Sequence, residues 1–418
     1  MSSSQAICVD VDERDETVIV GGGPAGMLLA WLLAQQGVPV HVLERHPDFN
    51  REFRGEGIQL SVVRLLQRLG WLDELLEAGI AQRAVAARVF VDDEQVTSLV
   101  GDADAEDFGI ILHQPLYLPW LHDKLLRTGC YRATFGASAS DIVRDDDGRV
   151  VGMTVREGTA ERTVWGKQFV VAAGRGTVLR KRLHIEANAV DTHFNVLWMR
   201  LPRPQDERLV PDGFRAHLSG DALFILYTAE DGGLQVAWSR RDEQGLKERN
   251  FDKKKAMLLD DAPDGLRAYL DDTFTRERRT HFLKVQSDCA TQWCKDGVLF
   301  IGDAAHTMSP VAGQGINLAM RDAVEAANVL LAAHEAGRPF DDDDGLAFQR
   351  RREPEVHAMQ LFQRRLGYFM LGAPRWQVRA FFKVGLKVLT ALGVRQALLR
   401  RVQSGVVHVD DSLHVAAA

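Results

Sequence analysis

One short segment, residues 21–26, constrains the fold of this chain more than any other, because it reads Gly-Gly-Gly-Pro-Ala-Gly and satisfies the pattern GxGxxG. A buried apolar strand is predicted just before it at 17–20, an apolar helix just after it, and a second buried strand at 38–43. Strand, glycine-rich turn, helix and strand in this order predict a βαβ unit and a parallel sheet. The expected fold class is therefore α/β, with a Rossmann-like domain.

Each part of this segment has a physical role in binding a dinucleotide. Gly21 permits the tight turn, Gly23 allows the backbone to approach a pyrophosphate, and Gly26 allows close packing of helix on strand. The helix N-terminus adds partial positive charge, and Glu44, at the end of the second strand, can accept hydrogen bonds from a ribose. The alternative is a purely structural glycine-rich turn. The predicted dinucleotide contacts are Gly21, Gly23, Pro24, Ala25, Gly26, Glu44 and the adjoining Arg45.

Composition narrows the class of ligand. The chain has 51 basic and 58 acidic residues and a net charge of −7, which argues against a general nucleic-acid binder, because phosphate neutralisation needs a basic surface. Small molecules are expected instead. No apolar run is long enough to span a bilayer and no secretory signal is visible, so a cytoplasmic location is expected. The four cysteines have no CxxC spacing and are expected to be free thiols, and no metal site is predicted.

The chain is predicted to contain a discontinuous cofactor domain with an inserted sheet. Alternating apolar and polar positions from about 195 to 286 predict a half-exposed antiparallel sheet, which would face a substrate. Residues 341–344, all aspartate, predict a solvated loop, followed by helix. The predicted segments are 14–84, 112–190 and 287–340 for the cofactor domain, 85–111 and 191–286 for the sheet domain, and 345–418 for a helical C-terminal region.

Basic residues recur every four positions near the C-terminus, at Arg375, Arg379, Lys383 and Lys387. This spacing places them in one stripe on a helix. We expect a solvated helix face. A peripheral contact with anionic lipid or with an acidic partner is the alternative interpretation.

A second motif far downstream reads Gly-Asp-Ala-Ala-His at 302–306 and is followed by Pro310 and by Gly-Gln-Gly-Ile-Asn at 313–317. With the first motif, it makes residues 14–340 resemble the single-component FAD-dependent aromatic hydroxylases of the para-hydroxybenzoate hydroxylase family. The resemblance implies that Asp303 binds the ribitol of FAD. It also implies that the next helix directs its N-terminus at the flavin pyrimidine, where backbone N–H groups favour the negative charge of reduced flavin. The residues concerned are Pro310, Gly313, Gly315, Ile316 and Asn317.

Two further positions match the same family. Arg54 corresponds to an arginine near the pyrophosphate and the nicotinamide, and Gln114 to a glutamine beside the flavin. Either could also be an ordinary surface residue. His306 is expected to make local hydrogen bonds, with a catalytic role as the alternative, and no residue can be named as catalytic base from sequence.

One segment departs from the family pattern. The family carries an Asp-Gly pair after a strand, followed by a small and a basic residue that serve FAD and NADPH. Here Gly174, Thr177 and Arg180 match, but the Asp is missing and the segment is one residue short. This puts reduction by NADPH in doubt more than FAD binding.

The resemblance implies an FAD-dependent monooxygenase that uses NADPH or NADH and molecular oxygen. It would hydroxylate an aromatic or polyketide-like small molecule of secondary metabolism, such as antibiotic biosynthesis, through a flavin C4a-hydroperoxide. The first alternative is an FAD oxidoreductase of the same fold that converts its substrate without direct NAD(P)H use. The second is a nonenzymatic FAD-binding relative. A monomer and a homodimer are both compatible with the sequence.

Overall fold

The computed structural model describes residues 16–49, 56–84, 86–100, 108–190, 194–240, 242–385 and 388. Its central element is a six-stranded sheet in the order β20-β21-β12-β1-β2-β8. All neighbours in this sheet are parallel except β20 and β21. The strands are β1 (Thr17–Val20), β2 (Val40–Glu44), β8 (Tyr131–Phe135), β12 (Gln168–Val171), β20 (Cys294–Lys295) and β21 (Val298–Phe300).

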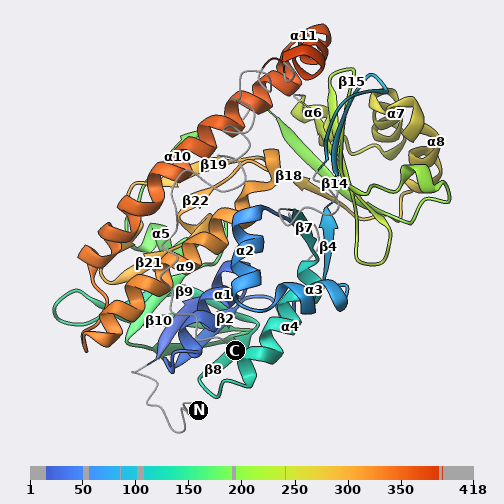
Figure 1. Cartoon of the computed structure of the whole chain (residues 1–418). Coiled ribbons are helices and arrows are strands. Elements are labelled where there is room, and N and C mark those ends of the chain that lie inside the picture. The colour runs from blue at the N-terminus through green and yellow to red at the C-terminus, as the bar shows by residue number, and fades with distance from the viewer. Residues whose placement is uncertain are drawn as a thin grey trace.

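Three apolar helices pack together beside this sheet. Ten of the eleven residues of α1 are buried, because it packs between its own strands and the helices α4 and α9 (Figure 1). The predicted parallel α/β fold is therefore confirmed. These helices are α1 (Pro24–Ala34), α4 (Gln114–Leu126) and α9 (Gln314–Glu335).

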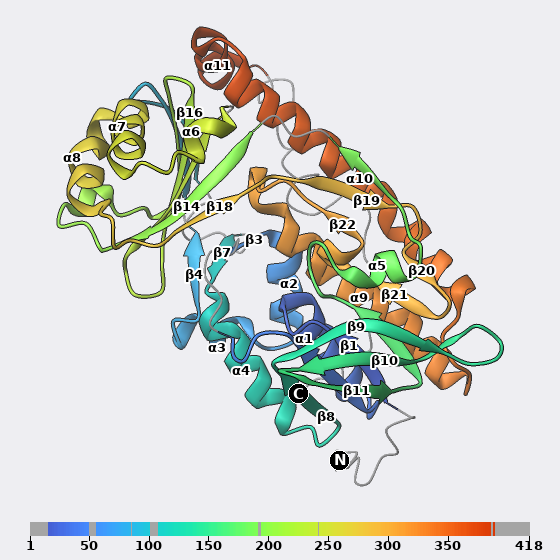
Figure 2. The same cartoon turned by 180° about the vertical axis from the view of Figure 1, so that it is seen from behind.

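Three small sheets surround the central one. The antiparallel sheet of β9, β10 and β11 lies beside β1 when the molecule is seen from behind (Figure 2). The other two sheets are β13-β19-β22 and β3-β7-β4. Their elements and the short helices nearby are β3 (Gly57–Ile58), α2 (Leu60–Arg68), α3 (Leu72–Glu77), β4 (Ala81–Ala84), β7 (Gly109–Leu112), β9 (Ala137–Arg144), β10 (Val150–Glu157), β11 (Ala160–Trp165), α5 (Val178–Arg182), β13 (Ala187–Val190), β19 (Ser287–Ala290), η3 (Gly302–Ala304), β22 (His306–Thr307) and η4 (Val311–Gly313).

A seven-stranded sheet forms the second layer, in the order β18-β14-β17-β16-β15-β5-β6. It joins chain segments on either side of α4, and β15 with β5 is its one parallel pair. Its strands are β5 (Ala86–Val91), β6 (Glu94–Val100), β14 (Asn195–Leu201), β15 (Gly213–Ser219), β16 (Ala222–Thr228), β17 (Leu234–Arg240) and β18 (Thr280–Leu283), with η2 (Glu207–Leu209) between β14 and β15.

This sheet is buried on both faces, so the prediction of a half-exposed sheet was wrong. Alternate residues of β14 belong to two different apolar clusters: Leu197 and Met199 to the outer one, Val196 and Trp198 to the inner one. The outer face is covered by helices that the alternating pattern did not predict (Figure 1). These are α6 (Glu243–Leu246), α7 (Phe251–Asp261) and α8 (Asp264–Thr273).

A long helix, α10 (Asp342–Gly372), runs from the central sheet to the seven-stranded sheet, where α11 (Arg375–Ala380) and a π-helical turn, η5 (Phe381–Gly385), follow (Figure 1). Its start corrects the prediction of a solvated acidic loop. Asp341 is the N-cap and forms a capping box with Asp344, while Asp342 and Asp343 lie in the first turn. Acidic side chains stabilise this end of a helix because they complement its dipole.

The basic stripe is also corrected by the structure. Arg379 lies 3.1 Å from Asp92, Lys383 pairs with Glu94, and Arg375 donates to the backbone oxygen of Gly220. These side chains dock the helix onto the second layer instead of forming a solvated face. Lys387 lies outside the described residues.

Three of the cysteines have a defined state in the structure. Cys289 and Cys294 are free thiols, but Cys130 is disulfide-bonded, which corrects the expectation of four free cysteines. That expectation considered only spacing along the chain, which does not determine which cysteines meet in space.

Among the described residues, no helix combines the length and the apolar run needed to cross a bilayer.

Candidate functional site

The glycine-rich turn has the geometry that its sequence predicts. Gly21 has φ +115°, a conformation that side chains disfavour, and a Cβ there would lie 2.4 Å from the backbone oxygen of Ala172. A Cβ on Gly26 would lie 2.0 Å from the backbone oxygen of Gly21. Gly23 is the N-cap of α1, and Pro24 and Ala25 begin the helix. Only glycine at 21 and 26 therefore allows α1 to start this close to β1 and β12.

Glu44 lies at the end of β2, buried beside this turn. Its carboxylate accepts a hydrogen bond from the backbone N–H of Gly22 at 2.7 Å and from that of His46 at 2.9 Å. Both bonds hold the carboxylate at the carboxyl edge of the parallel sheet, where dinucleotides bind in this class of fold. Arg45 next to it is exposed. A ribose contact by either residue stays a prediction.

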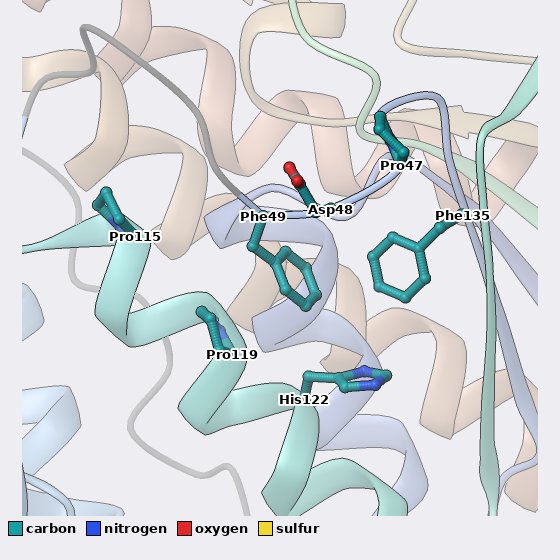
Figure 3. A pocket seen from close by; sticks show the side chains of 7 residues that line it. All are labelled: Pro47, Asp48, Phe49, Pro115, Pro119, His122 and Phe135. Atoms are coloured by element: carbon teal, nitrogen blue, oxygen red, sulfur yellow. The ribbon is translucent and has the colours of Figure 1, made fainter.

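An apolar cavity of about 550 Å³ opens at the same edge. It is lined by residues that follow β2, by the end of β8 and by one side of α4 (Figure 3). The rings of Phe49, His122 and Phe135 pack against one another in its wall, with centroids 4.9–5.5 Å apart. Burial lowers the pKa of His122, so its ring contributes an uncharged, flat surface. The lining residues are Pro47, Asp48, Phe49, Pro115, Pro119, His122 and Phe135.

The second motif is brought against the first. Gly302 has φ +58°, and a Cβ there would lie 2.9 Å from the Cβ of Ala319 on α9 and 3.9 Å from that of Ala25 on α1. The turn that presents Asp303 thus lies between the N-terminal ends of α1 and α9. Asp303 is partly exposed, with an oxygen 3.9 Å from Arg175 Nε. Two segments nearly 280 residues apart in the chain form one site.

The N-terminus of α9 is the third component. Pro310 starts the preceding turn, and Gly313 is the N-cap with φ +60° and ψ +33°. Because the first turn of a helix has no intrahelical partners for its N–H groups, those of Gly315 and Ile316 can bind an acceptor at this end. This is the arrangement expected for flavin binding.

The side chain of Asn317 makes three hydrogen bonds within the protein. Its amide oxygen accepts from the backbone N–H of Gln59 at 2.8 Å, and its amide nitrogen donates to the backbone oxygens of Gly57 and Gly313, each at 2.9 Å. The side chain therefore fixes β3 against the start of α9. Any flavin contact by Asn317 would have to come from its backbone.

His306 belongs to a buried ionic network. Its Nε2 lies 2.7 Å from Asp322, which also accepts from the backbone N–H of Gly302 at 2.9 Å and from Arg352 at 2.8 Å. Glu355 pairs with Arg352 and continues the network. Burial alone would raise the pKa of Asp322, but the charges of His306 and Arg352 outweigh it and lower this pKa to about 2. The structural interpretation of His306 is supported, because this network holds the turn that presents Asp303.

Sequence reasoning missed a buried acid next to Gln114. Gln114 begins α4, and its backbone N–H donates to Glu56 at 3.3 Å. The other oxygen of Glu56 lies 3.3 Å from His113 Nδ1. Burial raises the pKa of Glu56, and His113 Nε2 has no hydrogen-bond partner in the described part of the chain. The missed signal was an acid two residues after Arg54, which itself lies outside the described residues.

The inner face of the seven-stranded sheet presents aromatic rings near this acid. The ring of Phe214 lies 5.5 Å from that of Tyr227, which lies 6.1 Å from that of Trp198. A Cβ on Gly57, next to Glu56, would lie 3.0 Å from Phe214. The aromatic face and the turn that carries Glu56 are therefore in contact.

The shortened segment after β12 keeps its basic residues engaged. Gly174 and Gly176 both have φ +73°, and Thr177 caps α5. Arg180 lies 3.1 Å from Asp288 of β19, and both side chains are largely buried. This pairing reduces the availability of Arg180 to an incoming nucleotide phosphate.

These residues fit FAD as the cofactor on three independent grounds. The first is a turn at Gly21 and Gly26 that a Cβ would block, the second is the acid Glu44 at the sheet edge, and the third is the N-terminus of α9 beside Asp303. These features provide close backbone approach for a pyrophosphate, an acceptor for a ribose, and donors for the negative charge of reduced flavin. The described residues therefore fit a flavin dinucleotide.

Comparison with known proteins agrees with this geometry. Residues 14–344 match the family described as FAD binding domain. The chain is 29% identical over 403 residues to the 6-methylpretetramide 4-monooxygenase of Streptomyces rimosus, covering 93% of this chain and 92% of that one. It is 26% identical over 333 residues to the dialkyldecalin synthase of Streptomyces rugosporus, covering 78% and 67%. The structure of p-nitrophenol 4-monooxygenase from Pseudomonas putida is similar with a TM-score of 0.76 at 18% identity, covering 94% and 99%.

Proposed function

The chain belongs to the FAD-binding-domain family of flavoproteins that includes the aromatic hydroxylases, and from this premise we propose that it hydroxylates a polycyclic aromatic polyketide. FAD is the cofactor, NAD(P)H the reductant and molecular oxygen the co-substrate. The observation that carries the proposal is the convergence of both cofactor motifs at Gly302, together with the contact of an aromatic sheet face with Gly57, which Asn317 joins to the start of α9. One relative, covered to 92% of its length, is named 6-methylpretetramide 4-monooxygenase, which supports a multi-ring substrate.

The cofactor residues have separate tasks in this proposal. Glu44 binds the adenosine ribose, with Arg45 and the apolar cavity at Phe49 on the same side. Asp303 binds the ribitol, and the N–H groups of Gly315 and Ile316 face the pyrimidine ring. FAD, when bound there, supplies the oxygen-activating chemistry.

The aromatic face explains how a flat substrate would be held. The ring of Tyr227 lies 6.1 Å from that of Trp198 and 5.5 Å from that of Phe214, and stacked or edge-on aromatic contacts favour planar multi-ring ligands. Both layers are apolar where they meet. A bound substrate would therefore exclude water from the reacting centre, which protects reactive oxygen chemistry from decay.

The pair of Glu56 and His113 is the ionisable group that we assign to proton handling. A phenol becomes a better nucleophile when it loses its proton, so a buried acceptor beside the flavin is useful. Burial raises the pKa of Glu56, which brings a carboxyl nearer to the working pH of the enzyme. The carboxylate of Glu56, which His113 contacts at 3.3 Å, would hold the proton.

A second candidate function is supported by two observations on the segment after β12. The missing Asp before Gly174 and the pairing of Arg180 with Asp288 both weaken the expected nucleotide contacts. A flavoenzyme that converts its substrate without direct NAD(P)H use would have this arrangement. One relative, the dialkyldecalin synthase, carries a name that is not that of a monooxygenase.

Oxygen uptake by the purified flavoprotein tests the proposal. We expect uptake that requires both NADPH or NADH and a tetracyclic phenolic substrate, with one labelled oxygen atom from ¹⁸O₂ in the product by mass spectrometry. The variant Glu56→Gln should lower turnover by roughly 10²-fold or more if the pair handles a proton. Product formation that needs no nicotinamide cofactor and no oxygen would favour the second candidate instead.

A further inference from the structure

A group of three potential metal ligands lies where α10 crosses β19, outside the flavin site. The Sγ of Cys289, a carboxylate oxygen of Glu353 and a ring nitrogen of His357 all lie within 4.8 Å of one another. In the described part of the chain this is the one such cluster of three or more. Thiolate, imidazole and carboxylate together are the ligand types that Zn²⁺ prefers.

The fold brings these side chains together for definite reasons. Glu353 and His357 are four residues apart on α10, so they share one face of the helix, and their side chains already lie 3.8 Å apart. One turn further on, Gln360 donates to the backbone oxygens of Asp288 and Thr307 at 2.9 and 3.1 Å. This bond fixes the same helix face against β19, which carries Cys289.

The electrostatics of the cluster favour a cation. Cys289 is buried, and the carboxylates of Glu353 and Asp288 place negative charge beside its sulfur. The sulfur contacts the backbone oxygen of Ala290 at 3.7 Å and the side chain of Trp293. The negative charge of these carboxylates disfavours a thiolate without a metal, but it attracts a divalent cation. The bound cation then displaces the proton of the thiol.

We propose that Cys289, Glu353 and His357 form a Zn²⁺ site that ties α10 to β19. Binding forms a Zn–S, a Zn–N and a Zn–O bond and releases one proton from Cys289 to solvent. Because the side chain of His357 is 57% exposed, water completes the tetrahedral coordination on the open side. The ion links α10 to β19 and thus stabilises the protein. It takes no part in the flavin chemistry.

Zinc retention by the FAD-loaded enzyme tests this site. The protein is freed of metal with a chelator, equilibrated with Zn²⁺ in a metal buffer and desalted, and zinc and flavin are measured on the same sample. We expect one zinc per chain and a higher melting temperature in the presence of Zn²⁺. His357→Ala and Glu353→Gln should each weaken zinc binding on the order of 100-fold. Loss of a residue that only hydrogen-bonds to a metal ligand already lowers metal affinity about 10–100-fold.

Matched variants separate this site from accidental binding. His334→Ala removes an exposed histidine of α9, and Cys294→Ser removes the other free thiol; both should retain the zinc of the wild type. A thiolate-to-metal absorption band with Cd²⁺, present in wild type and absent in Cys289→Ser, would support the site further. Equal zinc retention by wild type and His357→Ala, or no retention by wild type, would overturn the proposal.

Discussion

Gly26 is the residue whose substitution the geometry predicts most sharply. A Cβ at this position would lie 2.0 Å from the backbone oxygen of Gly21, so Gly26→Ala must displace α1 from the glycine-rich turn. We expect purification without bound FAD and a loss of about 1–3 kcal/mol in the free energy of unfolding. Flavin content and urea unfolding measure both effects.

Gly265→Ala is the matched control. Gly265 lies in α8, and a Cβ there would meet no atom within 4 Å. This variant should keep its flavin and gain up to about 1 kcal/mol, because alanine favours a helix over glycine. Full flavin occupancy in Gly26→Ala would contradict the assigned role of the turn.

His41 gives the fold a dependence on pH. It is fully buried in β2, with Nε2 2.8 Å from Thr134, and burial, aided by the charges of Arg132 and Arg162, lowers its pKa to about 3. Glu16 lies 3.8 Å away, but Arg132 neutralises it through a bidentate pair.

The sign of the effect follows from this lowered pKa. Above pH 6.5 His41 is neutral in both states, whereas below it the unfolded chain binds a proton that the folded chain refuses until about pH 3. Stability is therefore lost as the pH falls through this window, by about 2 kcal/mol between pH 7 and pH 5. Urea unfolding at the two pH values should show this loss reduced in His41→Gln but not in His334→Gln. Equal losses in His41→Gln and wild type would refute the assignment.

Individual residues differ in how far the sequence could predict them. Gly21 and Gly26 were predictable because the turn pattern has a local steric cause. The contacts of Asn317 with Gly57 and Gln59 span about 260 residues, and the pair of Glu56 and His113 spans 57. Such pairs depend on how distant segments pack, which no local pattern records.

The cofactor site depends on the buried contacts between η3, α9 and α10. Asp322 on α9 accepts from Gly302, His306 and Arg352 at once. In Asp322→Asn, Arg352 loses its ion pair with this residue in the interior. We expect a loss of about 3–5 kcal/mol in unfolding free energy and weaker FAD binding, measured by urea unfolding and flavin titration.

Glu325→Gln provides the comparison on the same helix. Glu325 is also buried, but its partner Arg351 is 57% exposed and lies 2.6 Å away. Water can solvate Arg351, so this substitution should cost only about 1 kcal/mol. If both variants lost the same small amount of unfolding free energy, the network would not hold the turn that carries Asp303.

Elements with a clear period were predictable, and those that depend on another layer were not. The βαβ opening and the helix after Gly315 follow from apolar runs beside glycines. The acidic run at 341–344 predicts a loop if only its charge is considered. Aspartate also favours the N-cap and first turn of a helix, and this preference determines the structure here. The cover of the second layer by α7 and α8 was missed, although the sequences of β14 and β16 are almost continuous apolar runs, which are typical of strands buried on both faces.

At the scale of the whole molecule, α10 links the two layers that form the site. It contacts η4 and α9 in the cofactor half and β16 in the sheet half, and α11 continues to β5 and β6 through Arg379 and Lys383. The aromatic face is thus held at a fixed place relative to the turn of Asp303. The boundaries of the predicted cofactor, sheet and C-terminal regions stay a prediction.

Anaerobic reduction of the bound flavin tests the central claim most directly. NADPH or NADH is added to the purified flavoprotein with and without a polycyclic phenolic ligand, and the visible flavin absorbance is followed. We expect bleaching that such a ligand accelerates, despite the shortened segment at Gly174. Flavin that dithionite bleaches but neither nucleotide reduces, with any aromatic ligand present, would contradict it and favour a flavoenzyme that works without NAD(P)H.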